Sequence, residues 1–529
     1  MTKQRSVVIV GGGHNGLVAA AYLAKAGIAV TVLEKLSHVG GAAVSAQAFE
    51  GVDANLSRYS YLVSLLPQRV IDDLGLELTL ARRRYSSYTP VPDGDGGLLV
   101  DTGDALATAE SFAALGAEGD ADAWGRFYDG TGRLARALFP TLTEPLLTRS
   151  EAREAVGDDV LWNAIIERPI GETIEATFEN DLVRGVVLTD ALIGTFSPAH
   201  DPELHANRCF LYHVIGGGTG DWDVPVGGMG AVSGELARAA RLAGATIVTD
   251  AEVTRIDPAT GEVHYRHDGA TVVATGDRVL AGVAPSVLSR LMDAPVADIA
   301  QGTHTLPGAQ VKVNLVLSRL PGLRDTSLDP AAAFGGTFHI NETYRQLQQA
   351  FESASSGELP SPLPAEIYCH SLTDPSILSP ELQAAGVQTL TVFALHVPHA
   401  LIAETDPNSA EHAAWRDRVQ AAVIASLDSV LAEPIESVLM TDAHGRPCIE
   451  TKTTLDLEAA LDLPAGNIFH GGLDWPFAED DADLSTPAAR WGVATAFERV
   501  LLCGSGARRG GAVSGIGGHN AAMAVLESL

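Results

Sequence analysis

The apolar pattern at the start of the chain changes its period twice within 34 residues. Residues 6–10, SVVIV, form a β-branched run that ends at a glycine, which is typical of a buried parallel strand. Residues 17–27, LVAAAYLAKAG, are rich in alanine and stop at Gly27, which predicts a helix. Residues 28–33, IAVTVL, return to strand-forming residues and end at Glu34. The pattern therefore predicts a strand–helix–strand unit of the α/β class.

Three later stretches predict further elements. A helical stretch closed by Gly244 is followed by residues 245–248, ATIV, which predict a strand. Residues 500–503, VLLC, predict a buried strand that runs into glycines and then into a helix starting near Gly518. Residues 311–318, VKVNLVLS, alternate apolar and polar positions, which indicates a strand of a second sheet.

The turn after the first strand carries a candidate cofactor motif. Gly11, Gly13 and Gly16 form G-x-G-x-x-G between a predicted strand and a predicted helix. Such glycines let the backbone turn tightly and approach a pyrophosphate at a helix N-terminus, where N–H groups favour an anion. Glu34, at the end of the second strand, is placed to accept hydrogen bonds from a ribose. The unit predicts dinucleotide binding but does not by itself choose between NAD and FAD.

Residues 33–45, LEKLSHVGGAAVS, add a glycine doublet just beyond that acid. The segment resembles L-E-x-x-x-R-x-G-G-R-x-x-S/T of the glutathione-reductase-like FAD superfamily, in its amine-oxidase and phytoene-desaturase branch. The resemblance implies that the doublet, Gly40 and Gly41, passes close to the diphosphate and the flavin. His38 and Ala42 stand where that branch often has arginines, so any arginine contact to the diphosphate is missing.

Two other stretches resemble motifs of the same branch. Residues 251–253, AEV, resemble the segment whose valine, here Val253, meets the adenine through its backbone. Residues 504–522 resemble the last flavin motif of phytoene desaturases, in which a helix N-terminus faces the flavin. Arg509 replaces the usual proline, which implies either a less rigid loop or an added positive charge near the flavin. The resemblance and the glycine motif together assign FAD and these candidate cofactor residues: Gly11, Gly13, His14, Asn15, Gly16, Glu34, Lys35, Gly40, Gly41, Ala42, Val253, Gly504, Gly511 and Val513.

Segments spread along the chain narrow the resemblance to one subgroup. Residues 60–66, 308–321, 334–344 and 466–477 look like the subgroup named for pyridine nucleotide-disulfide oxidoreductase domain-containing protein 2. The implied fold is α/β (α+β overall): a glutathione-reductase-like FAD-binding Rossmann domain with an inserted substrate domain of mixed sheet and helices. The expected FAD domain is discontinuous and the substrate domain comes from two insertions, with these boundaries: 1–75, 220–305 and 464–529 for FAD, 76–219 and 306–463 for substrate.

Composition limits the partners and sites. The 529 residues include 35 Lys and Arg against 66 Asp and Glu, a formal net charge of −31. This negative field repels polyanions, so nucleic acid is not expected as a partner and membrane contact is expected to be peripheral at most. Four separated cysteines without a CxxC pair, and the absence of HExxH, predict no dithiol centre and no metal site. With no signal-peptide pattern and no long apolar run, a cytoplasmic protein is expected.

The resemblance implies an FAD-dependent oxidoreductase. We expect flavin N5 to take a hydride from a C–H bond of an apolar small molecule, such as an isoprenoid, polyene or other unsaturated compound, forming or rearranging a double bond. An enzyme of the flavin amine oxidase type is the alternative, and a non-enzymatic carrier of prenylated proteins or lipids with the same fold is a third hypothesis. Arg58, Tyr59 and Tyr61 are candidates to approach the flavin, with packing as the simpler role. The catalytic side chains, the electron acceptor (O2 or a quinone) and a homo-oligomeric state stay open.

Overall fold

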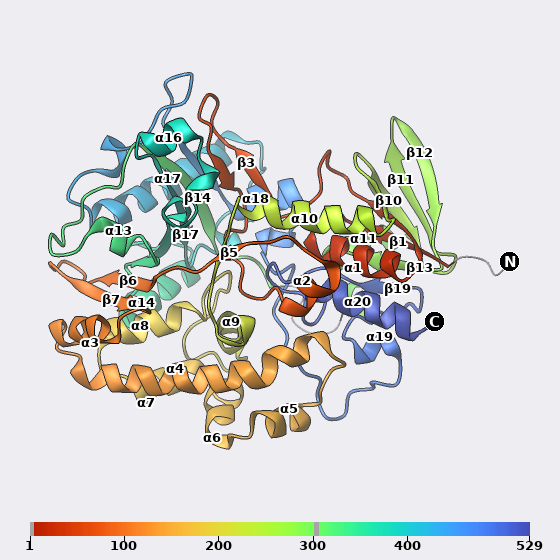
Figure 1. Cartoon of the computed structure of the whole chain (residues 1–529), viewed down its shortest axis with the longest axis horizontal. Coiled ribbons are helices and arrows are strands. Elements are labelled where there is room, and N and C mark those ends of the chain that lie inside the picture. The colour runs from red at the N-terminus through yellow and green to blue at the C-terminus, as the bar shows by residue number, and fades with distance from the viewer. Residues whose placement is uncertain (1–4, 301–305) are drawn as a thin grey trace.

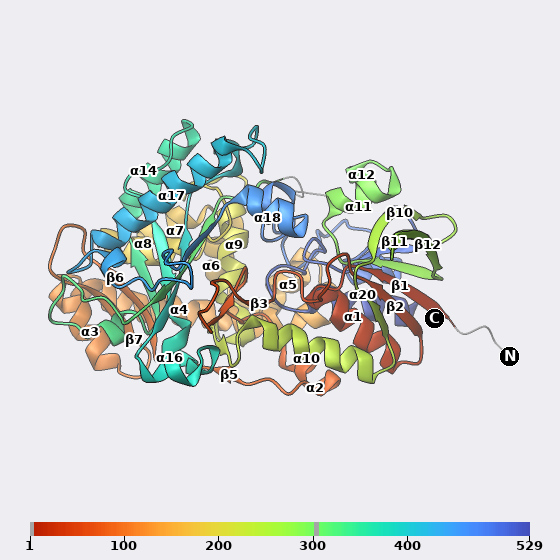
Figure 2. The same ribbon diagram turned by 90° about the horizontal axis from the view of Figure 1, so that it is seen from above.

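The computed structural model describes residues 5–300 and 306–529. Residues 1–4 and 301–305, at the ends of two predicted FAD-domain segments, lie outside the described residues. Two regions stand side by side in both views (Figures 1 and 2): one contains α1, α10 and α20, and the other contains α4, α8 and a larger sheet. Within the described residues, no helix is both long and apolar enough to cross a membrane.

A five-stranded sheet forms the centre of the first region. All its neighbouring strands are parallel, and its apolar strands are buried because helices and loops cover both faces. The predicted strand–helix–strand unit is present as its first two strands in sequence and the helix between them. Its spatial order is β19 (Val500–Leu502), β13 (Arg278–Ala281), β1 (Ser6–Val10), β2 (Ala29–Leu33) and β9 (Thr246–Val248).

Helix α1 (His14–Lys25) is buried along almost its whole length. It packs between α10 (Met229–Leu242) and α20 (Ile516–Glu527), and its alanines allow the close approach. At the crossing with α20, a Cβ on Gly518 would lie 1.9 Å from the carbonyl oxygen of Asn15. The glycines of the C-terminal segment therefore serve helix packing as well as any ligand.

Smaller elements border this sheet and connect it to the second region. They are the antiparallel three-stranded sheet β10 (Glu252–Asp257), β11 (Glu262–His267) and β12 (Ala270–Thr275), and the pairs β3 (Ser45–Gln47) with β4 (Asn55–Ser57) and β5 (Leu80–Ala81) with β8 (Val224–Pro225). The helices here are α2 (Gln68–Leu74), α11 (Pro285–Met292), α12 (Val296–Ile299) and α19 (Pro487–Arg490).

The second region is built on a mixed seven-stranded sheet. Only β15 and β6 run parallel among its neighbouring pairs in the described residues. The strand that the alternation VKVNLVLS predicted is β14, but every one of its side chains is buried. The order is β18 (Ile449–Lys452), β14 (Val311–Leu317), β17 (Gln388–Ala394), β16 (Ala365–Tyr368), β15 (Thr337–Ile340), β6 (Tyr85–Pro90) and β7 (Gly97–Asp101).

Helices cover both faces of this sheet, which explains the burial of β14. One face packs against α17 (Ala410–Asp428) in a continuous apolar core, and the other faces a helical layer that Figure 1 shows around α4, α8 and α9. The helices of this layer are α3 (Ala105–Ala114), α4 (Glu118–Leu138), α5 (Arg149–Val156), α6 (Asp159–Trp162), α7 (Ile170–Thr177), α8 (Asp181–Thr189) and α9 (His205–Val214). The others are α13 (Pro330–Ala333), α14 (Tyr344–Ser355), α15 (His370–Thr373), α16 (Pro380–Ala384) and α18 (Thr454–Leu461).

The strands of the two sheets divide between the predicted segments. Those of the five-stranded sheet come from 1–75, 220–305 and 464–529, and those of the seven-stranded sheet come from 76–219 and 306–463. The chain is thus a mixed α/β protein with a Rossmann-like unit. The exact domain boundaries and the glutathione-reductase-like label stay predictions.

Candidate functional site

The glycine loop (residues 11–16) joins β1 to the N-terminus of α1. Gly13 caps the helix in an extended conformation, so the first-turn N–H groups of α1, which begins at His14, have no partner within the helix. A Cβ on Gly16 would lie 2.2 Å from the carbonyl oxygen of Gly11, whereas a Cβ on Gly13 would meet nothing closer than the Cα of Gly41 at 3.9 Å. The loop is therefore closed at Gly16 and open at Gly13, where a pyrophosphate would sit.

Glu34 closes this loop from the end of β2. Its Oε2 accepts the N–H of Gly12 at 2.7 Å, and its Oε1 accepts the N–H of Leu36 at 2.9 Å. The side chain is buried, and these two bonds fix it beside the loop. The next residue, Lys35, forms an ion pair with Asp462, the residue that follows α18, so two segments far apart in the sequence meet here.

The glycine doublet lies directly against the glycine loop. The N–H of Gly40 donates to the carbonyl of Gly12 at 2.9 Å. Gly40 and Gly41 have φ of 121° and 58°, a region that side chains disfavour, and a Cβ on Gly40 would lie 2.8 Å from atoms of Val44 and Ser233. The conformation and the packing of the doublet therefore require glycine. The presence of His38 and Ala42 in place of arginines does not change this requirement.

The C-terminal glycine segment completes the cradle on the other side of α1. His14 Nε2 lies 3.0 Å from the carbonyl oxygen of Ala512, and Asn15 Nδ2 donates to the carbonyl of Gly510 at 3.4 Å. Burial lowers the pKa of His14 to about 4, and that of His470 nearby also to about 4, so both rings are neutral at pH 7. The buried Oδ1 of Asn15 has no partner among the described residues, which leaves an acceptor for a ligand donor.

Twelve of the fourteen predicted cofactor residues line one cavity of about 830 Å³. Gly40 and Gly511 do not line it; a Cβ on Gly511 would lie 2.8 Å from Leu473, so packing accounts for that glycine. The open helix N-terminus, the buried acid and the free amide oxygen fit a dinucleotide such as FAD, although each residue's contact with it stays a prediction. The twelve are Gly11, Gly13, His14, Asn15, Gly16, Glu34, Lys35, Gly41, Ala42, Val253, Gly504 and Val513.

Arg509 does not enter this cavity. Its guanidinium is buried and donates to the carbonyls of Thr141, Glu144 and Trp491 at 2.7–3.2 Å. The arginine that replaces the usual proline thus holds the loop to neighbouring segments and points its charge at carbonyl oxygens. The less rigid loop and the positive charge near the flavin that the sequence suggested both stay predictions.

The cavity continues into a chamber between the seven-stranded sheet and helices α4, α8 and α9. Tyr61 and Tyr368 meet in its wall with ring centroids 4.7 Å apart. Tyr59 also lines the cavity, whereas Arg58 does not. Polar and apolar residues share the remaining wall, and its aromatic and aliphatic side chains include Trp124, Tyr128, Val186, Ile193, Tyr212, Phe393, Ile468 and Phe469.

Lys312 is a site residue that the sequence reasoning missed. It lies on β14, is 3% exposed, and lines the cavity with its ammonium 5.0 Å from the centre of the Tyr61 ring. Nζ donates to the carbonyls of Ser57 at 2.6 Å and Tyr59 at 2.9 Å. Burial lowers its pKa to about 7, and the opposing effect of the Glu450 carboxylate is smaller. Glu450 itself forms ion pairs with Arg58 and Lys452. The only sequence signal was a lysine at a polar position of a strand that proves to be covered on both faces.

A buried acid–imidazole cluster at another part of the chamber was also unforeseen. His339 Nδ1 lies 2.7 Å from Glu342 Oε2, and Glu366 accepts Thr189 Oγ1 at 2.9 Å and the hydroxyl of Tyr368. One donor atom from each of His339, Glu342 and Glu366 lies within 4.8 Å of the others. Burial raises the pKa of Glu366, and the neighbouring Glu342 raises it further. Hydrogen bonds within the protein thus occupy the imidazole Nδ1 and both oxygens of Glu366.

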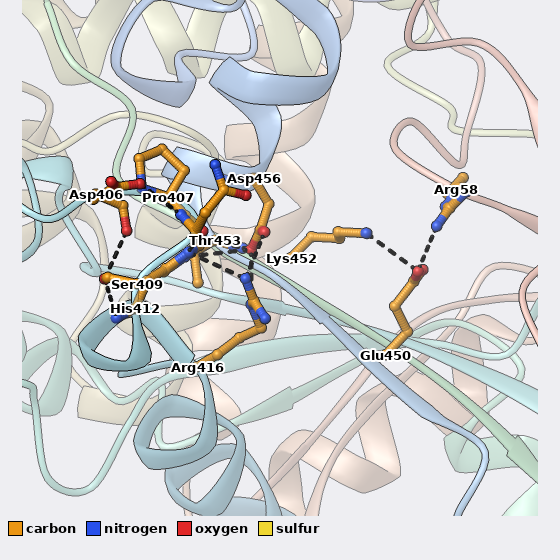
Figure 3. A network of polar contacts seen from close by, with 11 residues as sticks. Arg58, Asp406, Pro407, Ser409, His412, Arg416, Glu450, Lys452, Thr453 and Asp456 are labelled. Carbon is orange, nitrogen blue, oxygen red and sulfur yellow. Dashed lines mark hydrogen bonds and ion pairs between the residues drawn. The ribbon is translucent and has the colours of Figure 1, made fainter. Parts of the chain in front are cut away.

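Arg58 connects the two regions instead of approaching the cofactor cavity. Its Nη2 pairs with Glu450 Oε1 at 2.7 Å, and Lys452 reaches the same carboxylate at 3.2 Å (Figure 3). Just after the end of β18, Thr453 is hydrogen-bonded to buried His412 of α17. His412 also lies near Arg416 and Asp456 (Figure 3). These contacts hold β18 and α18 in place, and α18 contributes Leu457 and Leu461 to the cavity lining.

We expect Glu450→Gln to lower stability at pH 7 by about 1–2 kcal/mol, because the partly buried Arg58 loses its charged partner. Burial alone would raise the pKa of Glu450, but the bonds from Arg58 and Lys452 lower it overall. Its stabilising effect is therefore present above about pH 4.5 and is lost as the pH falls through the depressed folded-state pKa. Thermal unfolding from pH 3.5 to 8 tests this: the deficit should shrink at acid pH, and Glu172→Gln, which breaks an exposed pair with Arg168, should change little. An equal deficit at every pH would contradict the ion-pair explanation.

Comparisons with known proteins agree with this geometry. Residues 9–68 match the family model described as NAD(P)-binding Rossmann-like domain. An uncharacterized protein of Mycobacterium tuberculosis is 57% identical, over 99% of this chain and 97% of its own length. Pyridine nucleotide-disulfide oxidoreductase domain-containing protein 2 of Mus musculus is 30% identical, over 99% of this chain and 93% of its own length.

More distant matches include a carotenoid desaturase and an amine oxidase. Carotenoid 3,4-desaturase of Haloarcula japonica is 28% identical over 47% of this chain and 50% of its own length. The solved structure of cyclohexylamine oxidase from Brevibacterium oxydans shares the fold with a TM-score of 0.54 at 16% identity, covering 99% of this chain and all of that one. All four cysteines of the chain are buried and free, so the words "disulfide oxidoreductase" in the relatives' name describe no dithiol centre here. The chain belongs to the family of pyridine nucleotide-disulfide oxidoreductase domain-containing protein 2, and it is an FAD-dependent oxidoreductase.

Proposed function

We propose that the protein oxidises a C–H bond of a largely apolar small molecule, such as an isoprenoid, a polyene or another unsaturated compound, and thereby forms or rearranges a double bond. The observation that carries this proposal is the single cavity that joins the glycine loop to the aromatic chamber. FAD, when bound, supplies hydride acceptance at the flavin. The protein would contribute a fixed orientation for the substrate.

Lys312 is suited to hold a proton during this reaction. A neutral lysine amine has two N–H groups and one lone pair. Because Ser57 and Tyr59 each accept one N–H, the lone pair is left to accept a proton inside the cavity. With a pKa of about 7, the amine is partly unprotonated at neutral pH and is still basic enough to accept a proton from the substrate. We therefore assign Lys312 the removal of the proton that accompanies double-bond formation.

Amine oxidation is the second candidate. The tilted aromatic pair Tyr61 and Tyr368 in the cavity wall is the feature that favours it, because aromatic faces attract a cationic amine. The cyclohexylamine oxidase fold adds support only at the level of the scaffold. The electron acceptor is a separate question for either candidate.

Anaerobic mixing of the FAD-loaded protein with a compound panel tests the proposal. Polyenes, unsaturated fatty acids, isoprenoids, primary amines and NAD(P)H are each added while the flavin band near about 450 nm is followed. We expect bleaching with one class of apolar unsaturated compound and its recovery with O2 or a quinone. Bleaching by amines alone would support the second candidate, and bleaching by none of the apolar classes would refute the first.

A further inference from the structure

Arg83 is a cation inside the chamber that neither the cofactor cradle nor the proposed base uses. It stands in the run Arg82-Arg83-Arg84 just before β6. The two outer arginines turn to carboxylates, with Arg82 2.7 Å from Asp221 and Arg84 3.1 Å from Asp101. Arg83 lines the cavity, as Arg82 does, but within the described residues Arg83 makes no ion pair. The three arginines lie between β5 and β6, outside both strands.

The partners of Arg83 are all neutral. Nε donates to the carbonyl of Trp222 at 3.2 Å, Nη1 donates to Thr337 Oγ1 at 3.0 Å, and the guanidinium lies 5.8 Å from the centre of the Tyr368 ring. In the part of the chain that the structure describes, no carboxylate lies within ion-pair distance of it and Nη2 has no hydrogen bond. An enclosed charge without a counterion is costly, and a guanidinium cannot escape that cost by losing its proton.

The acidic groups nearby do not replace a counterion. Glu366 is engaged by Thr189 and Tyr368, and Glu342 is paired with His339. Asp190 lines the cavity, and its carboxyl group has no hydrogen bond within the described residues. Burial raises its pKa to about 6, so it can relieve its own burial by taking a proton. Asp223 also lines the cavity and acts electrostatically on Arg83, but its carboxylate lies 3.7 Å from Nε of Arg82. Together these carboxyl groups would repel a doubly charged phosphate more strongly than a singly charged carboxylate.

We propose that Arg83 binds the carboxylate of the substrate, which makes the substrate class an apolar carboxylic acid whose hydrocarbon part lies along the aromatic chamber. A guanidinium offers two parallel N–H donors that match a carboxylate. The cavity that Arg83 shares with the glycine loop is also lined by apolar side chains, among them Trp124, Ile193 and Phe393. The identification of this ligand as a substrate rests on the proposed function; the binding itself does not.

Calorimetric titration of the FAD-loaded protein at pH 8 with three ten-carbon probes tests the proposal. Decanoate, decanol and decylamine share one chain and differ only in the end group. We expect decanoate to bind at least about 10-fold more tightly than the other two, because a charged hydrogen-bonded pair adds affinity that a neutral or cationic end lacks. Arg83→Gln should weaken decanoate about 10- to 100-fold and leave decanol unchanged, while Arg83→Lys should restore part of the preference.

Arg84→Gln is the matched control, since it removes the neighbouring guanidinium that faces Asp101 at the surface. It should leave all three affinities as in the wild type. Equal binding of the three probes, preference for decylamine, or no binding by any of them would overturn the proposal, as would an unchanged decanoate affinity in a folded Arg83→Gln variant. Flavin content and bleaching are measured separately, so a protein that bleaches with a polyene but shows no carboxylate preference would lose only this inference.

Discussion

Replacement of Gly13 by valine is expected to give a folded protein that no longer retains FAD. Gly13 has φ −68° and ψ 171°, which any residue adopts, and a Cβ there would touch no protein atom closer than 3.9 Å. The space is open within the protein and lies at the N-terminus of α1, where the pyrophosphate is expected. A valine side chain fills that space, so the affinity for FAD should fall at least about 100-fold, or about 2.7 kcal/mol.

The ratio of flavin to protein absorbance after gel filtration measures this loss, and circular dichroism shows whether the apoprotein is folded. Gly234→Val is the matched control, because Gly234 is exposed on α10 and its Cβ would meet nothing within 4 Å. Gly16→Ala should behave differently from both, since its Cβ would lie 2.2 Å from the Gly11 carbonyl oxygen and disturb folding itself. Normal flavin loading of Gly13→Val would mean that the pyrophosphate does not pass the glycine loop.

The sequence predicted the Rossmann-like unit well because its signals are local. A β-branched run, a glycine turn, an alanine-rich helix and a terminal acid are each set by neighbouring residues, and β1, α1 and β2 appear where expected. The glycine motifs were also informative. A Cβ at Gly16, Gly40 or Gly518 would clash with neighbouring atoms, so these positions require glycine. Family resemblance then extended the prediction to Val253 and the C-terminal segment, which line the same cavity.

The chamber could not be predicted in the same way, because its polar groups come from strands whose surroundings are tertiary. The alternation at residues 311–318 identified β14, but a polar position on a strand normally faces water, and here it faces a covered cavity. Lys312 and Arg83 are therefore ordinary in the sequence and unusual only in the fold. Arg58 was a candidate for the cofactor because it follows the glycine doublet in sequence, with a packing role preferred; its carboxylate partner lies on β18, which the sequence could not identify.

Lys312→Met is expected to slow flavin reduction by about 10²- to 10⁴-fold while FAD stays bound, because the variant removes a proton acceptor and keeps the apolar stem. In the wild type, the anaerobic rate with the bleaching compound should rise with pH through an inflection near 7, since only the neutral amine accepts a proton. The variant should lack this inflection. Stopped-flow reduction from pH 5.5 to 9.5 measures both effects. Lys452→Met, on the strand position paired with Lys312 but outside the cavity lining, should keep the wild-type profile.

Stability gives a second measurement that needs no substrate. The pKa of Lys312 is depressed in the folded state from 10.5 to about 7, so between these values the unfolded chain binds more protons than the folded one. Wild-type stability should therefore rise as the pH increases from about 7 towards 10, and Lys312→Met should lack that contribution. The melting temperature of the variant relative to the wild type should accordingly be highest below pH 7 and should decline at alkaline pH. Two results together would contradict the role of Lys312: a melting-temperature difference that is constant with pH, and a Lys312→Met rate profile that keeps the wild-type inflection. They would show that Lys312 is an ordinary ammonium and that another group removes the proton.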